Sequence, residues 1–212
     1  MSSDGTTSGT PTTIQSQARA SRRQYSAADV ELIEDYLNKV EQEQMYKFLQ
    51  GPGWGYGARS HMGNDASRYW FKHFAGFWEV PTAGLDHHTQ AEQELNKYPL
   101  VEAIWQKVRG RSRLLRCYAN GYPFGAEGGV HKDSLAAEHY TLLYYPHLHW
   151  HPDWAGETLF FNERGDDLLC AVYPKPNRLV RFPSSIPHVA RGISRLCPML
   201  RITLMFKVSS AN

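Results

Sequence analysis

The sequence predicts an α+β fold that is mainly β, with a double-stranded β-helix (jelly-roll) core and two or more supporting N-terminal helices. Two observations lead to this prediction. The first half of the chain contains stretches with apolar residues at helical spacing. The second half divides into short runs rich in β-branched and aromatic residues, separated by Gly, Pro, Asn and Asp. A chain of 212 residues is long enough for one domain of ordinary size with a single core.

The N-terminal segment, residues 1–22, consists mostly of Ser, Thr, Gly and Gln and contains almost nothing apolar. Such a composition cannot offset the entropy that ordering the chain would cost. We therefore expect a disordered tail over residues 1–22, followed by a single domain over residues 23–212.

Two helices are predicted before the strands. Ser26 and Asp29 resemble a capping box, and apolar residues then recur at helical spacing until Gly51 stops the pattern. A second helix is predicted over residues 100–110, which are apolar on one side only.

The segment between these helices is irregular and rich in aromatic residues. Most of its rings are expected to pack in the core, because aromatic side chains bury large areas. Trp54 and Tyr56 are the two that we consider as candidates for substrate contact.

Eight short β-rich runs follow Gly110 and place the jelly-roll core at about residues 111–208. They cover residues 112–118, 129–133, 139–145, 156–162, 168–173, 178–182, 188–192 and 200–207. Eight strands suit a double-sheet jelly roll, and the helices are expected to cover the outer face of one sheet.

Charge and composition argue against several kinds of partner. The net charge is +2, without runs of Lys and Arg, which gives no reason to expect nucleic-acid binding. No stretch approaches the roughly 20 apolar residues of a membrane span, and the first residues lack the apolar segment of a secretory signal, so we expect a cytoplasmic protein without membrane association.

Cys117, Cys170 and Cys197 show no CxxC spacing and are expected to be reduced and mostly buried. The sequence carries no signal for an oligomeric state.

A candidate metal site consists of His131, Asp133 and His188. The first two form a His-x-Asp tripeptide where a predicted strand ends, and His188 lies far downstream in another strand. Two imidazoles and one carboxylate on one face of a metal leave three positions open, which is the facial triad of Fe(II) oxygenases. The tripeptide alone is weak evidence for a metal site. The motifs that surround it, in their order along the chain, strengthen that prediction.

Those motifs make residues 113–208 resemble the 2-oxoglutarate/Fe(II)-dependent dioxygenase superfamily, and within it the prolyl 4-hydroxylase-like branch. The resemblance passes through RCYANG, GGVHKD, LLYYPHLHW, WAGETLFF, PKPNRLVRFPSSIPHVARG and LRITLMFK. It implies that the triad binds Fe(II) and that a basic residue on the last strand holds the distal carboxylate of 2-oxoglutarate. Here the matching residue is Arg201, although it follows His188 at a longer interval than usual, which leaves Arg195 as a competitor.

Strand alternation favours Arg201 over Arg195. Arg201 and Thr203 share one face of the last strand, and the apolar residues between and after them share the other. A guanidinium can pair with a carboxylate through two hydrogen bonds, and a hydroxyl beside it can donate another. The alternative is an ion pair between Arg201 and an Asp or Glu at the barrel mouth.

The resemblance also assigns roles to two tyrosines. Tyr145 would donate its hydroxyl to the same carboxylate, and Tyr118 would line the cosubstrate pocket, although Tyr118 could equally be a core residue. If Tyr118 faces inward, Arg116 faces inward too, because it lies two residues earlier on the same strand. Arg116 would then meet an anionic group of the primary substrate or form a salt bridge within the sheet.

Three alternate histidines, His147, His149 and His151, stand out in the HLHWH segment. They follow a predicted strand and precede Pro152, so we expect solvated loop histidines that bind no metal, with a role in contacting substrate as the alternative.

The resemblance implies an oxidoreductase: a dioxygenase (hydroxylase) that acts on paired donors with O2, with Fe(II) as cofactor and 2-oxoglutarate as cosubstrate. The expected substrate is a small metabolite or natural-product intermediate, or a peptidyl proline, and ascorbate is an expected reductant. Two alternatives remain. The first is a cupin-like metal-dependent enzyme that does not use 2-oxoglutarate, and the second is a non-catalytic jelly-roll binding protein.

Overall fold

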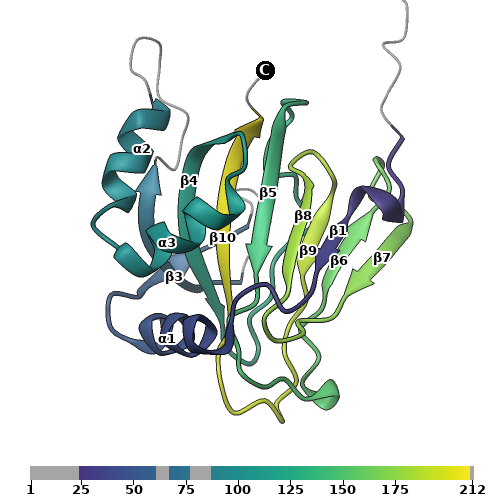
Figure 1. Ribbon diagram of the computed structural model, residues 1–212. Helices are drawn as coiled ribbons and strands as arrows, with labels where there is room; N and C mark the ends of the chain where they lie inside the picture. Colours follow the sequence, from purple (N-terminus) through teal and green to yellow (C-terminus); the bar gives the residue numbers. More distant parts are fainter. Residues whose placement is uncertain (1–23, 61–66, 77–86, 211–212) are drawn as a thin grey trace, which may run out of the picture.

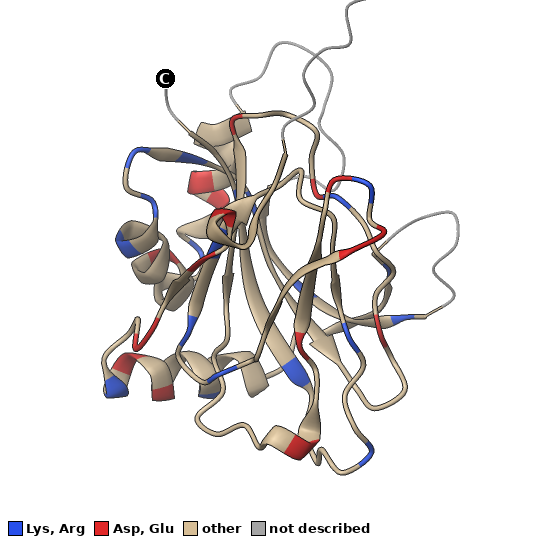
Figure 2. Cartoon of the chain, turned by 90° about the vertical axis from the view of Figure 1, so that its right-hand side faces the viewer, with Lys and Arg blue, Asp and Glu red and all other residues tan. Residues whose placement is uncertain are grey.

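The computed structural model describes residues 24–60, 67–76 and 87–210. The expected tail at residues 1–22 lies outside the described residues. No helix in the described ranges is long and apolar enough to cross a membrane. Lys and Arg are interspersed with Asp and Glu along the described chain rather than gathered on one element (Figure 2).

Two antiparallel sheets form the core (Figure 1). The larger sheet has seven strands in the order β1-β8-β5-β10-β4-β3-β2, and the smaller has three in the order β7-β6-β9. The larger sheet contains β1 (Glu31–Ile33), β2 (Gly55–Ala58), β3 (Tyr69–Gly76), β4 (Ser112–Tyr122), β5 (His139–Tyr144), β8 (Leu179–Pro183) and β10 (Arg201–Ser210). The smaller contains β6 (Thr158–Phe161), β7 (Leu168–Val172) and β9 (His188–Ala190). Both sheets together make the predicted jelly roll.

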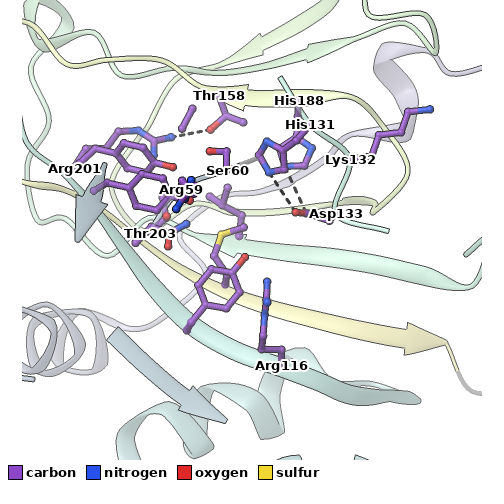
Figure 3. A pocket seen from close by; sticks show the side chains of 17 residues that line it. Arg59, Ser60, Arg116, His131, Lys132, Asp133, Thr158, His188, Arg201 and Thr203 are labelled. Atoms are coloured by element: carbon purple, nitrogen blue, oxygen red, sulfur yellow. Dashed lines mark hydrogen bonds and ion pairs between the residues drawn. The ribbon is translucent and has the colours of Figure 1, made fainter. Parts of the chain in front are cut away.

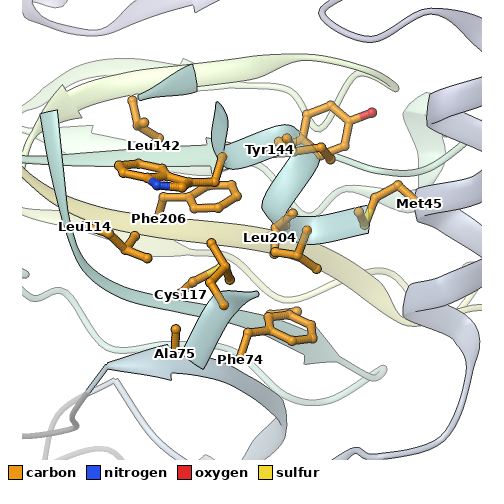
Figure 4. Close-up of a cluster of buried hydrophobic side chains, with 14 of the residues drawn as sticks. Met45, Phe74, Ala75, Leu114, Cys117, Leu142, Tyr144, Leu204 and Phe206 are labelled. Carbon is orange, nitrogen blue, oxygen red and sulfur yellow. The ribbon is translucent and has the colours of Figure 1, made fainter. Parts of the chain in front are cut away.

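Three helices, α1 (Lys39–Gln50), α2 (His87–Leu95) and α3 (Pro99–Val108), cover the outer face of the seven-stranded sheet, as predicted for one sheet (Figure 1). Their buried residues join one core cluster with the outward-facing residues of β4, β5 and β10 (Figure 4). On α3, Trp105 stacks on Phe206 of β10 with ring centroids 5.8 Å apart. The helices therefore close one face of the sheet and leave the other face for the cavity described below.

The first predicted helix begins later than expected. The capping box of Ser26 and Asp29 is present, but it opens only a short 3-10 helix, and Glu31–Ile33 then pairs with β8. The helix begins at Lys39, after a second capping box in which the Asn38 side chain accepts a hydrogen bond from the Glu41 amide at 3.0 Å. The prediction of helix from residue 30 was wrong because pairing with β8 draws this segment into the sheet.

Two further differences concern strands. The segment between the predicted helices is not irregular throughout, because it supplies β2 and β3 and also the helix α2. Residues 129–133 form no regular strand and contribute only an isolated bridge between His131 and His188. The other seven predicted runs are strands.

All three cysteines are free thiols, and two of them are buried.

Candidate active site

A cavity of about 240 Å³ lies between the two sheets (Figure 3). Residues of β4 and β10 line it from the larger sheet, and residues of β6 and β9 line it from the smaller one. It contains the three candidate metal ligands at one end and Arg201 at the other (Figure 3). The predicted alternation of the last strand is confirmed, because Arg201 and Thr203 face this cavity while Ile202 and Leu204 belong to the helix-covered core.

The structure brings His131, Asp133 and His188 together, with one donor atom of each within 4.8 Å of the others. Backbone hydrogen bonds connect the segments that carry them. The amide of His131 donates to the carbonyl of His188 at 3.0 Å, and the amide of His188 donates back at 2.9 Å. The amide of Asp133 donates to the Ser184 carbonyl at 2.8 Å. The triad is thus fixed by main-chain contacts between residues far apart in sequence.

Both histidines are oriented as metal ligands. Nδ1 of His131 lies 2.9 Å from the Gly129 carbonyl, and Nδ1 of His188 lies 2.9 Å from the Ile186 carbonyl. A carbonyl can only accept, so in each neutral ring Nδ1 carries the proton and Nε2 keeps its lone pair. Burial lowers the pKa of His188 to about 4, which keeps the ring neutral near pH 7. This donor set, with two imidazole nitrogens and one carboxylate, fits Fe(II).

Asp133 is held by two neighbours from the larger sheet. Its Oδ2 accepts a hydrogen bond from the Thr141 hydroxyl at 2.7 Å and contacts the ammonium group of Lys207. Burial alone would raise the pKa of Asp133, but the positive charge of Lys207 and the interactions with His188 and His131 together outweigh burial and hold that pKa well below its usual range. The carboxylate is therefore ionised, as a metal ligand must be.

Arg201 forms the other end of the cavity and is 1% exposed. Its Nε donates to the Gly156 carbonyl, and its Nη2 donates to the Thr158 hydroxyl at 2.8 Å. The Tyr145 hydroxyl lies 2.7 Å from that of Thr158 and 3.4 Å from Nη2. Thr203 is buried and lines the same cavity. These hydroxyls surround a guanidinium whose Nη1 makes no hydrogen bond within the described residues.

No carboxylate in the described part of the chain forms a salt bridge with Arg201. The predicted alternative, an ion pair of Arg201 with an Asp or Glu at the barrel mouth, is therefore wrong. A buried cation without an anionic partner is costly, and a bound carboxylate would offset that cost. Arg195, the competitor, is exposed and does not line the cavity.

A glycine is required at position 156, where the backbone passes close to the side chain of Arg201. Its φ is +86°, and a Cβ there would lie 3.1 Å from Arg201 Cδ and 3.0 Å from Ile193 Cγ2. Only glycine combines this backbone conformation with so close an approach.

The remaining candidates divide into two groups. Tyr118 and Arg116 both line the cavity, so β4 presents them inward as expected. Trp54 packs against the helix-covered core, and Tyr56 is 60% exposed beside Trp70. Neither Trp54 nor Tyr56 lines the cavity, so the structure does not support their role as substrate contacts.

The solvated-loop prediction holds for His149 and His151, which are exposed, but is wrong for His147. His147 is fully buried, and its Nε2 accepts a hydrogen bond from the Ile202 amide at 2.9 Å. Its ring also packs against Trp150 with centroids 4.6 Å apart. The loop folds back over the start of β10, and sequence alternation alone could not reveal that.

His147 should make the protein sensitive to acid. Burial, together with the charge of Arg201, lowers the pKa of His147 to about 3, whereas an imidazole in the unfolded chain titrates near pH 6.5. The unfolded chain therefore takes up the proton first, and stability present above pH 6.5 is lost as the pH falls. We expect a loss of about 2 kcal/mol between pH 7 and 5 from this group.

Denaturant unfolding of wild type and His147→Gln at several pH values measures this loss. The glutamine keeps an acceptor for the Ile202 amide but does not titrate, so the stability difference between the two proteins should shrink as the pH falls. Parallel curves over pH 7 to 5 would show that His147 does not control the acid response.

Sequence reasoning missed three polar residues of the site: Thr141, Thr158 and Lys207. Strand alternation could have indicated Lys207, because it lies on the same face of β10 as Arg201 and Thr203. Its contact with Asp133 spans 74 positions in sequence and could not be found from the pattern. Thr158 lies in the predicted strand over residues 156–162, but nothing in that pattern distinguishes it from its neighbours.

The sequence matches no protein-family model, and no curated protein is similar enough to count as a relative. Solved structures are similar in fold. An oxidoreductase of the 2OG-Fe(II) oxygenase family from Burkholderia pseudomallei superposes with a TM-score of 0.59 at 12% identity, covering 88% of this chain and 87% of its own. A prolyl-4-hydroxylase from Pseudomonas putida has a TM-score of 0.56 at 17% identity, covering 87% of this chain and 94% of its own.

A prolyl hydroxylase from Trichoplax adhaerens, in complex with a hypoxia inducible factor oxygen degradation domain peptide fragment, is also similar. Its TM-score is 0.55 at 16% identity, with coverage of 87% of this chain and 84% of its own. The chain therefore has the jelly-roll fold of the 2-oxoglutarate/Fe(II) oxygenases, which confirms the predicted fold class and the resemblance at the level of the fold. Prolyl hydroxylases are among the proteins of this fold that it is similar to.

Proposed function

We propose that this protein is an Fe(II)- and 2-oxoglutarate-dependent oxygenase that hydroxylates an unactivated C–H bond with O2. One observation carries the proposal. A buried guanidinium with no carboxylate partner among the described residues faces the same cavity as a triad of two histidines and one aspartate. A cupin-like metal enzyme or a non-catalytic binding protein has no need of that cation.

The chain supplies ligands, orientation and a secluded cavity. His131, Asp133 and His188 would hold Fe(II), which when bound supplies the oxygen-activating chemistry. Thr141 and Lys207 keep the Asp133 carboxylate ionised and in place. Three protein ligands would leave open positions on the metal for the cosubstrate and O2.

The Arg201 end of the cavity would bind the distal carboxylate of 2-oxoglutarate. Nη1 of Arg201 makes no hydrogen bond within the described residues, and Thr203 lines the cavity, so both can bind this carboxylate. Tyr145 does not itself line the cavity, but its hydroxyl lies 3.4 Å from Arg201 Nη2 and would add a hydrogen bond there. Their burial excludes water, which strengthens a charge-assisted pair. Tyr118 forms part of the wall between this end and the triad.

The cavity favours a small substrate group. Its volume of about 240 Å³ lies below the range of roughly 300–1,000 Å³ that is usual for ligand pockets, and Fe(II) and 2-oxoglutarate would occupy part of it. A small metabolite, a natural-product intermediate or the single side chain of a peptidyl proline would fit this limit. We propose ascorbate as the reductant that keeps the iron in its Fe(II) state.

An anaerobic titration of the purified protein with Fe(II) and 2-oxoglutarate tests the proposal. A weak visible charge-transfer band should appear only when both are present, because it requires both on one iron. Iron binding without the band would favour the cupin-like alternative, and no stoichiometric iron binding would favour the binding protein. Succinate release with amino acids, proline-rich peptides and lipophilic small molecules, in the presence of ascorbate, then identifies the substrate.

A further inference from the structure

The β5–β6 segment, residues 145–157, approaches Arg201 near both of its ends. Near its beginning, Nε2 of His147 accepts a hydrogen bond from the amide of Ile202, the residue after Arg201. Near its end, the carbonyl of Gly156 accepts a hydrogen bond from Nε of Arg201. The segment therefore contacts both the backbone of β10 beside Arg201 and the guanidinium itself.

His147 is poorly suited to a role in packing alone. Because its Nε2 accepts a hydrogen bond, Nδ1 carries the proton of the neutral ring, and this buried group has no acceptor among the described residues. An apolar side chain of similar size would avoid the cost of an unpaired buried donor. What the imidazole adds is an acceptor for the Ile202 amide at the start of β10. From α1, the Gln42 side chain donates to the His147 carbonyl at 2.6 Å and helps to hold the residue in place.

The turn that carries the Gly156 carbonyl has an unusual backbone. Ala155 has a φ of +54° and Gly156 has a φ of +86°. A positive φ at a residue with a Cβ costs free energy and persists only where the surrounding structure enforces it, often at ligand sites. Here Nε1 of Trp150 donates to the Ala155 carbonyl at 2.9 Å, and the Tyr173 hydroxyl donates to the Trp150 carbonyl at 2.8 Å. These bonds hold the turn that directs the Gly156 carbonyl toward Arg201.

We propose that His147 and Trp150 are positioning residues that orient the guanidinium of Arg201 for the distal carboxylate of 2-oxoglutarate. This inference rests on the proposed function and gives the HLHWH segment a part in cosubstrate binding. The two rings pack with centroids 4.6 Å apart, so they form one support. Neither residue lines the cavity, so both act through Arg201 rather than by touching the ligand. Orientation matters because a planar guanidinium pairs with a carboxylate through two directed hydrogen bonds.

The dissociation constant of 2-oxoglutarate, from the anaerobic charge-transfer titration, tests the proposal. His147→Leu keeps a buried side chain but removes the acceptor, and should raise that constant about tenfold while Fe(II) affinity stays unchanged. His147→Gln keeps an acceptor and should bind 2-oxoglutarate nearly as wild type does. Trp150→Phe keeps an aromatic ring but removes the indole N–H, and should also raise the constant.

Phe206→Leu is the matched control for a loosened fold. Phe206 lies on β10 as well, but on the helix-covered face, so the variant should lower the melting temperature and leave 2-oxoglutarate binding unchanged. The inference is overturned if His147→Leu binds 2-oxoglutarate as wild type does. It is also overturned if His147→Gln is as weak as His147→Leu, or if Fe(II) affinity falls in step with 2-oxoglutarate affinity.

The Nε–H group of Arg201 gives a second readout that requires no 2-oxoglutarate. In ¹H–¹⁵N NMR of the wild type it should be an arginine Nε–H signal that exchanges slowly with solvent and is absent from Arg201→Lys. Exchange should be faster in His147→Leu and Trp150→Phe but not in His147→Gln. Equal protection in all of these variants would show that the segment does not orient Arg201.

The two readouts separate failure of the inference from failure of the proposed function. If the wild type forms no charge-transfer band, the proposed function fails, while the Nε–H signal still decides whether the segment orients Arg201. If the band forms but the His147 and Trp150 variants bind 2-oxoglutarate as wild type does, only the positioning role is wrong.

Discussion

Alanine in place of His131 is expected to abolish oxygenase turnover and to reduce Fe(II) affinity by more than about 100-fold. Even the partners that merely orient metal ligands are commonly worth 10–100-fold in affinity, and a lost ligand should cost more. The side chain of His131 is 20% exposed, so its removal leaves little unfilled core volume. Anaerobic Fe(II) binding and succinate release measure the two effects.

The other two ligands should show the same loss with different side effects. His188 packs against Phe182 with ring centroids 4.8 Å apart, so His188→Ala also opens a cavity and should lower the melting temperature. Asp133→Ala leaves the buried ammonium of Lys207 with the Thr141 hydroxyl but without its anionic partner and should be destabilising for that reason. His131→Ala is therefore the variant that separates metal binding from folding.

His149→Ala is the matched control, because it removes an exposed histidine that lies outside the cavity. It should bind Fe(II) as wild type does. Tight stoichiometric Fe(II) binding by the double variant His131→Ala, His188→Ala would show that the metal lies elsewhere.

Arg201→Ala is expected to raise the 2-oxoglutarate concentration needed for turnover by tens of fold or more, while Fe(II) affinity changes little. Loss of a charge-assisted pair in a desolvated pocket costs on the order of 2–5 kcal/mol. The guanidinium lies at the opposite end of the cavity from the triad, so the metal itself is not affected directly (Figure 3). Titration of the anaerobic charge-transfer band with 2-oxoglutarate gives the dissociation constant.

Arg201 also donates to Gly156 and Thr158, so part of its effect could arise from a loosened strand. Arg201→Lys keeps the charge but loses the planar fork, and it should fall between alanine and wild type. Arg195→Ala is the control, since Arg195 is exposed outside the cavity. The opposite pattern, with Arg195→Ala impaired and Arg201→Ala normal, would move the cosubstrate site to the loop before β10.

Local patterns predicted much of the site. Two-residue alternation along a strand is a property of the backbone, so it correctly placed Arg201 and Thr203 together on the cavity face and Ile202 on the other. The same rule turned Arg116 inward with Tyr118. Seven of the eight expected strands after Gly110 formed because their β-branched and aromatic residues agree with the sheet that they enter.

Sequence alone predicted the jelly-roll class, because strand composition is local. It predicted the triad only from the His-x-Asp tripeptide together with the ordered motifs around it, since His188 lies far downstream. Only the tertiary structure decided that residues 31–33 pair with β8 rather than continue a helix, since a strand exists through its partner. It also decided that His147 is buried and that Lys207 meets Asp133. Those contacts join segments 55 and 74 positions apart, and their stability comes from burial and charge pairing that no periodic pattern records.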